Sequence, residues 1–192
     1  MRLSRRVALG LSLPVFLLAL PASARDCEGV NMPDQVTVEG AKLILNGMGV
    51  REATVFNVNV YVAALYLLKR SSDGQKIAAA EEPKQMRLQF VRDVSKSDMA
   101  EAIQKGFVRA TGDGYGKLKA RVERLMATLP EFKNGDRFTI TYRPGTGVEL
   151  KSSRASTTIE GADFARGLFL IWLGEHPPNA GLKQGLLGGE CG

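Results

Sequence analysis

Runs of alternating apolar and polar residues predict several β-strands along this chain. In the clearest run, Met86, Leu88 and Phe90 share one parity and polar residues take the other. A strand of this kind buries one face and leaves the other in solvent. Such alternation predicts strands at Gln35–Val38, Lys42–Leu45, Gln85–Val91, Arg137–Arg143 and Val148–Lys151.

The stretch Leu43–Leu68 combines glycines, a single arginine and two strand-like runs. Asn46-Gly47 and Gly49 tolerate a positive φ, so we expect the chain to reverse there. This turn would present Arg51 at the start of the next strand.

That next strand is predicted in two parts. Residues 54–61 alternate for part of their length, as in a half-buried strand, and residues 62–68 are apolar at both parities, as in a strand covered on both faces. Tyr61 would then lie further along the same strand as Arg51, where its hydroxyl group could reach the same ligand.

Apolar residues at helical spacing predict the helices. Met99, Ile103 and Phe107 recur every four residues after Ser95, which is a favourable N-cap. Similar stripes predict helices at Gly116–Leu129 and Gly161–Leu173, and Gln75–Ala80 predicts one or two further turns. Strands grouped apart from helices are typical of an α+β fold, in which helices cover one face of an antiparallel sheet.

The first 24 residues are typical of a secretory signal peptide. Three arginines precede the apolar run Val7–Leu20, and Ala22–Ala24 forms a small-residue cleavage site. A membrane anchor is the alternative, but the run is shorter than the roughly 20 residues that a span needs. We therefore expect a periplasmic protein with one domain at 25–192 and no stable membrane anchor after cleavage.

The charge and the cysteines refine this expectation. Without residues 1–24, 23 basic side chains remain against 20 acidic ones, and no basic cluster is interleaved with aromatic residues. Nucleic-acid binding is therefore not expected. Cys27 and Cys191 lie near the two ends, and in an oxidising compartment they favour a disulfide over two free thiols.

Several kinds of chemistry have no motif here. His176 is the only histidine and has no cysteine or acidic cluster near it, so neither a metal site nor a histidine-based triad can be assembled. No phosphate-binding loop occurs, and Gly112, Gly114 and Gly116 follow a predicted helix where a dinucleotide fingerprint would follow a strand. We expect no cofactor.

Arg51 allows two interpretations. It could be a solvated turn residue paired with Glu52 or another surface carboxylate, which contributes little. It could instead anchor an anion, because a guanidinium group binds a carboxylate through two parallel hydrogen bonds. The residues themselves leave both open.

Longer motifs bring in a family resemblance. LNGMGVR followed by VYVAALYL resembles the chalcone isomerase-like family, in which a G-x-G-x-R turn leads into a similar strand. FVRDVSKSDMAEAI and the closing IEGADFARGLFLIWLGEHPPNAGLKQGLLG also resemble it, so the likeness covers nearly all of the chain after residue 35. It implies an open-faced β-sandwich with a layer of helices over its antiparallel sheet.

The resemblance also implies which residues would carry a reaction. The plant enzyme of this family closes a chalcone ring with an arginine, a strand threonine, a tyrosine and an asparagine on one helix, and a threonine on the closing helix. The matching positions in this sequence are Arg51, Tyr61, the vicinity of Met99, the vicinity of Gly106 and the vicinity of Ile171. Only the arginine is retained.

An apolar cleft with one arginine and one tyrosine suits a fatty acid better than a flavonoid. The family's non-catalytic branch uses an arginine and a tyrosine at these positions, so the resemblance favours a binding protein for a fatty acid or similar amphipathic carboxylate. The ligand-binding residues expected are Arg51, Tyr61, Met99, Ile103, Ile171 and Trp172. Two alternatives stay open: an isomerase or lyase acting through Arg51, and a structural or interaction protein whose cleft Trp172 fills.

Overall fold

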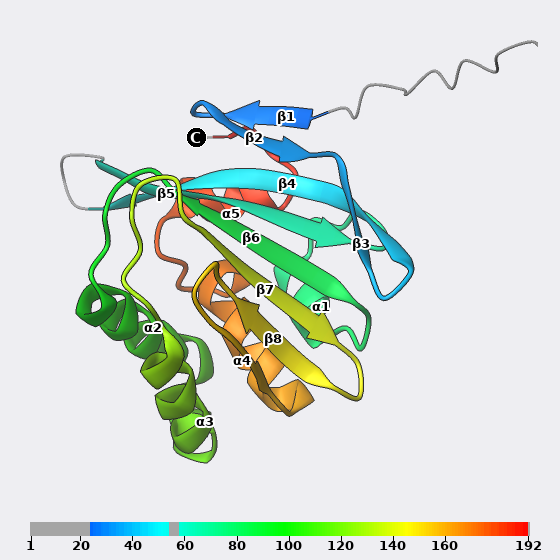
Figure 1. Ribbon diagram of the computed structural model, residues 1–192. Coiled ribbons are helices and arrows are strands. Elements are labelled where there is room, and N and C mark those ends of the chain that lie inside the picture. Colours follow the sequence, from blue (N-terminus) through cyan, green and yellow to red (C-terminus); the bar gives the residue numbers. More distant parts are fainter. Residues whose placement is uncertain (1–23, 54–57, 192) are drawn as a thin grey trace, which may run out of the picture.

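The computed structural model describes residues 24–53 and 58–191, so most of the predicted signal peptide lies outside it. An antiparallel seven-stranded sheet with the order β3-β4-β5-β6-β7-β8-β9 forms its centre (Figure 1). Its strands are β3 (Gln35–Val38), β4 (Ala41–Ala53), β5 (Val58–Leu67), β6 (Lys84–Phe90), β7 (Arg137–Arg143), β8 (Gly147–Lys151) and β9 (Ser156–Ile159).

Helices cover one face of this sheet. The residues that alternate inward, among them Met86, Leu88 and Phe90, pack with the helices into the larger of two apolar cores. The α+β fold expected from the sequence is therefore confirmed. The helical elements are α1 (Gly74–Ala79), α2 (Lys96–Thr111), the 3-10 turn η1 (Gly112–Gly114), α3 (Tyr115–Thr128), α4 (Ala162–Leu173) and α5 (Ala180–Leu186).

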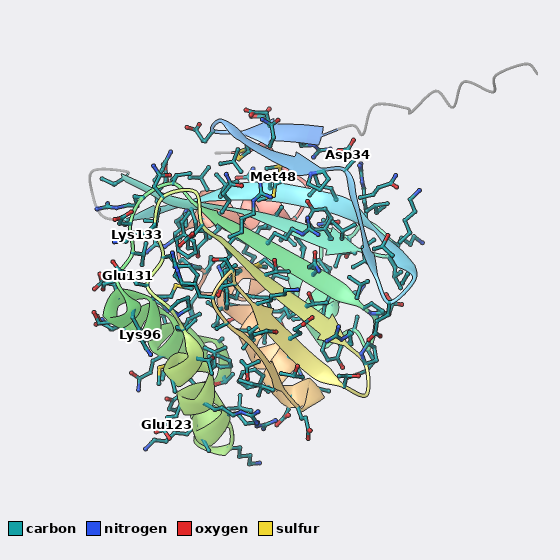
Figure 2. The ribbon with its side chains drawn as sticks, viewed as in Figure 1. Asp34, Met48, Lys96, Glu123, Glu131 and Lys133 are labelled. Carbon is teal, nitrogen blue, oxygen red and sulfur yellow. A yellow bond between two sulfur atoms is a disulfide. The ribbon has the colours of Figure 1, made fainter. Side chains whose placement is uncertain are left out.

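A hairpin of β1 (Ala24–Cys27) and β2 (Val30–Pro33) covers the opposite face near β4 (Figure 1). Its apolar side chains pack with residues of β3, β4 and β5 into a second core, in which Met48 lies beneath the hairpin (Figure 2). Cys27 and Cys191 form a disulfide pair with their Cα atoms 5.8 Å apart. The C-terminal segment is thereby tied to the hairpin.

The expected turn at Asn46–Gly49 is wrong. Gly47 and Gly49 lie inside the thirteen-residue strand β4, and neither has a positive φ. Their lack of a side chain serves packing instead, because a Cβ atom at either position would collide with the backbone of α5. Strand β4 continues through Arg51 to Ala53 and pairs antiparallel with β5, which begins at Val58; residues 54–57 of the predicted strand lie outside the described residues.

Asn46 lies at a shift in the pairing register of β4 with β5 and not in a turn. The side chain of Asn46 is 3% exposed. Its amide group donates to the carbonyl oxygens of Ser71 and Leu186 at 3.0 and 2.7 Å, and its oxygen accepts from the Ser71 N–H at 2.8 Å. One buried amide therefore joins β4, the loop before α1 and the end of α5.

In the described part of the chain, no helix has the length and apolar character required to cross a membrane.

Candidate functional site

Arg51 and Tyr61 are cross-strand neighbours. Antiparallel pairing places Arg51 of β4 directly opposite Tyr61 of β5. The prediction that the two residues share one strand is therefore wrong. Directly opposite side chains on one sheet face lie close together. The pairing therefore brings a guanidinium and a phenol group to the same place through hydrogen bonds of the backbone.

A second irregularity adjoins this pair. The register shifts between Arg51 and Glu52, because Tyr61 pairs with the first and Asn59 with the second, which leaves Val60 as the extra residue of a bulge. Bulges of this kind change the direction of neighbouring side chains. Val60 and Tyr61 both line the cavity described below.

Trp172 fixes the phenol group of Tyr61. The indole Nε1–H of Trp172 donates to the Tyr61 hydroxyl oxygen at 2.9 Å, and both side chains are buried. A hydroxyl that accepts one hydrogen bond still has its own O–H to donate. Tyr61 is thus held in place while its proton stays available for an acceptor in the cavity.

Burial also keeps this hydroxyl protonated. It raises the pKa of Tyr61 to about 12, although the hydrogen bond from Trp172 and the positive charge of Arg51 act in the opposite direction. At neutral pH the group is a hydrogen-bond donor. A deprotonated Tyr61 acting as a base would need strongly alkaline conditions.

A cavity of about 300 Å³ lies beside this pair, between the β4–β5 end of the sheet and helices α2 and α4. The structure brings together at this cavity all six residues that the sequence analysis expected in the site: Arg51, Tyr61, Met99, Ile103, Ile171 and Trp172. Their role in binding stays a prediction. Trp172 forms one wall and does not fill the cavity, contrary to the alternative of a cleft closed by this side chain.

The inner wall is apolar, and the outer edge is charged. Met99, Ile103 and Ile171 are each at most 4% exposed. The exposed side chains along α2 at the outer edge are Asp98, Glu101, Lys105 and Arg109, of which Glu101 and Lys105 form an ion pair. This distribution suits an amphipathic molecule whose apolar part is enclosed.

Arg51 is partly buried, and no carboxylate of the described residues lies within ion-pair distance of it. The stretches outside the described ranges contain no acidic side chain. Arg51 lies within β4, which extends to Ala53, and it forms no ion pair with Glu52. The interpretation of Arg51 as a turn residue paired with Glu52 is therefore wrong. Its charge is available to an anion that enters the cavity.

Other cavity residues had weak or no sequence signals. Phe90 is on the inward parity of its strand, which was visible in the pattern, but Val60, Val94 and Pro178 carried no signal for a site. The bond between Trp172 and Tyr61 joins residues 111 positions apart and was not expected. Among the residues that the structure describes, no group of three potential metal ligands occurs.

The model of a protein family described as chalcone isomerase-like matches residues 24–188. The chain belongs to the chalcone isomerase-like family. Among solved structures, it resembles a fatty-acid binding protein of Arabidopsis thaliana with a TM-score of 0.69 and 12% sequence identity, over 86% of this chain and 96% of the other. A search of curated proteins found no match.

In this chalcone isomerase-like chain, the position expected to match the enzyme's asparagine serves packing. Gly106 of α2 faces Ile171 of α4, and a Cβ atom at Gly106 would lie 2.7 Å from Ile171 Cγ2, closer than real Cβ contacts. An asparagine does not fit there while Ile171 is present. Met99 and Ile171 contribute apolar surface where the resemblance assigns polar catalytic groups to the enzyme.

Proposed function

We propose that this protein binds a fatty acid or similar amphipathic carboxylate and does not transform it. The observation that carries the proposal is Arg51 opposite Tyr61, without an ion-pair partner among the described residues, at a cavity whose inner wall is apolar. The structural similarity to a fatty-acid binding protein agrees with it, although at 12% identity that similarity shows the fold alone.

The ligand would place its carboxylate between Arg51 and Tyr61. Both groups donate, and hydrogen bonds that involve a charged partner are stronger than neutral ones. The acyl chain would lie against Met99, Ile103 and Ile171, where each buried methylene contributes about 0.8 kcal/mol. The cavity volume of about 300 Å³ is at the lower end of the roughly 300–1,000 Å³ usual for ligand sites, so a chain of medium length fits better than a long one.

The family contains both enzymes and non-catalytic fatty-acid-binding members. We infer that this chain is non-catalytic, because Met99, Gly106 and Ile171 stand where the resemblance assigns polar groups to the enzyme. Without those hydrogen bonds, a developing phenolate nucleophile has little stabilisation. An absorbance assay should therefore show no acceleration of chalcone cyclisation over the uncatalysed reaction at the same pH.

Isothermal titration with decanoate tests the binding proposal. Arg51→Met should weaken binding by about 2–5 kcal/mol, because the carboxylate would lose its charge partner at a partly buried site. Arg137→Met is the matched control, since Arg137 lies exposed on β7 and does not line the cavity. The fluorescence of Trp172, the only tryptophan, gives an independent signal from the cavity wall.

Two results would contradict the proposal. One is that the wild type binds none of the straight-chain carboxylates. The other is that Arg51→Met binds decanoate as tightly as Arg137→Met does.

Residues 1–24 further lead us to propose export to the periplasm. A mature chain that starts at Arg25 and gains two hydrogens on reduction of the Cys27–Cys191 pair would support this. Intact-mass measurement of protein from the periplasmic fraction, with and without reductant, checks both points. A protein that retains residues 1–24 and stays in the cytoplasm would contradict export.

A further inference from the structure

Ile171 lies at the cavity and packs against helix α2. Its side chain is 3% exposed and lines the cavity. Behind it lies Gly106, whose hypothetical Cβ atom would be 2.7 Å from Ile171 Cγ2 and 3.2 Å from both Cγ1 and Cδ1. Helix α2 therefore leaves no space into which Ile171 could retreat from a ligand.

The buried residues of α2 that line the cavity end at Ile103. Met99 and Ile103 line the cavity from α2, whereas Gly106 and Phe107, the next buried residues of this helix, do not, and Gly106 offers no side chain. Ile171 of α4 occupies the space that a side chain at Gly106 would take. The apolar wall beyond Ile103 is thus supplied by the other helix.

The neighbouring wall is fixed by a different interaction. Trp172 follows Ile171 on α4 and is held by its hydrogen bond to Tyr61. Ile171 is held by packing alone, which includes its contact with Gly106 of α2. The volume of the Ile171 side chain and the lack of a side chain at Gly106 therefore determine how much of the cavity beside Trp172 stays open.

We propose that Ile171 and Gly106 together set the length of the aliphatic chain that the cavity accepts. The identity of the ligand rests on the proposed function, whereas the limit on its length rests on this contact between α2 and α4. Shortening Ile171 lengthens the accepted chain. Adding a methyl group at Gly106 pushes Ile171 into the cavity and shortens it.

Titration of straight-chain carboxylates from hexanoate to palmitate tests this proposal. For the wild type, affinity should rise about fourfold with each methylene until the cavity is filled, and then level off. Ile171→Ala should move this break to chains about two or three methylenes longer, because the substitution removes three carbon atoms. Leu168→Ala is the matched control, since Leu168 is buried in the same helix and does not line the cavity.

Gly106→Ala should move the break to shorter chains. Alanine is otherwise preferred to glycine inside a helix, so a loss there is attributable to the contact with Ile171. The double variant Gly106→Ala/Ile171→Ala should bring the break back toward that of the wild type, because one side chain then vacates the space that the other enters. A purely structural role would change the melting temperature and leave the break unchanged.

A parallel series of n-alcohols separates this proposal from the carboxylate anchor. One outcome is that the chain length at the break shifts for alcohols in the Ile171 and Gly106 variants, while carboxylates bind no more tightly with Arg51 than without it. The limit on chain length then stands and the carboxylate anchor fails. If the break stays at one length in the wild type and all three variants, the length limit is overturned. If no chain of either series binds, both proposals are overturned.

Discussion

Two basic side chains extend from the inner face of the sheet, and they differ in what surrounds them. Lys84 of β6 is 2% exposed, and its ammonium group donates to the carbonyl oxygens of Ile77, Ala78 and Ala80 at 2.8, 3.3 and 2.6 Å. Arg51 of β4 is partly buried at the cavity, with no carboxylate of the described residues in ion-pair distance. An ammonium group has three donors, so Lys84 is saturated.

The surroundings of Lys84 explain how a charge is kept inside the core. Its Nζ atom lies 4.8 Å from the ring centroid of Tyr142 and 5.4 Å from that of Phe169, so aromatic faces add to the three carbonyl partners. Burial nevertheless lowers the pKa of Lys84 to about 8. Lys84 therefore stabilises the end of α1, whereas the described part of the chain supplies no ion-pair partner for Arg51.

The largest expected effect is a difference in unfolding free energy between variants of Lys84 and Arg51. Lys84→Met should lower the free energy of unfolding by about 2–4 kcal/mol, because three carbonyl groups lose a donor while the cost of burying a charge is removed. Arg51→Met should change it by less than about 0.5 kcal/mol. Urea denaturation of both variants measures this. Equal losses would remove the distinction between a structural and an available cation.

Tyr61→Phe addresses the second donor of the site. It should weaken decanoate binding by about 1.5–3 kcal/mol, the usual range for a hydrogen bond to a charged group. The loss should be smaller than that of Arg51→Met, since the charge remains. Isothermal titration of both variants ranks them, and a larger loss for Tyr61→Phe would identify the phenol group as the main anchor.

Arg51→Lys separates charge from geometry. The lysine keeps a positive charge but lacks the planar pair of donors, so binding should weaken by about 1–2 kcal/mol. Decanoate titration beside Arg51→Met provides the scale. If lysine is no better than methionine at this position, the two parallel hydrogen bonds matter and the charge by itself does not.

The smallest expected effect is a pH dependence from Lys84. The pKa of Lys84 is about 8 in the folded protein and 10.5 ordinarily, so the unfolded chain binds more protons between these values. Unfolding free energy should therefore rise with pH there, by about 1 kcal/mol between pH 8 and 9.5 relative to Lys84→Met. Below pH 8 this contribution is lost.

The pH range must end below the ionisation of the tyrosines. Burial raises the pKa of Tyr61, Tyr66 and Tyr142 to about 12 from 10.0, so they stabilise the fold below pH 10 and lose that contribution as the pH rises through 12. Urea denaturation at several pH values below 10 isolates Lys84. A wild type that loses stability relative to Lys84→Met in this range would contradict the assignment.

Local sequence patterns predicted most of the helices and strands. The period of two in β6 and β7 and the apolar stripes of α2, α3 and α4 predicted these elements within one or two residues, because each strand or helix must bury one face. The β1–β2 hairpin, β9 and α5 were not predicted. Their local signals are weak, because Ser156–Ile159 has a single large apolar residue, Ala24–Cys27 has two charged residues, and Ala180–Leu186 contains two glycines, which disfavour a helix.

The sequence by itself determined which residues were candidates for the site, since the family motifs singled out Arg51, Tyr61 and the vicinities of Met99 and Ile171. Only the tertiary structure decided how they meet. The glycines of β4 looked like a turn because glycine permits a positive φ, but their use here is the close approach of α5, a contact with residues more than 130 positions away. Backbone pairing of β4 with β5 then set Arg51 opposite Tyr61, and packing of α4 on α2 set Ile171 against Gly106. Such contacts depend on distances between segments remote in sequence, which no local pattern encodes.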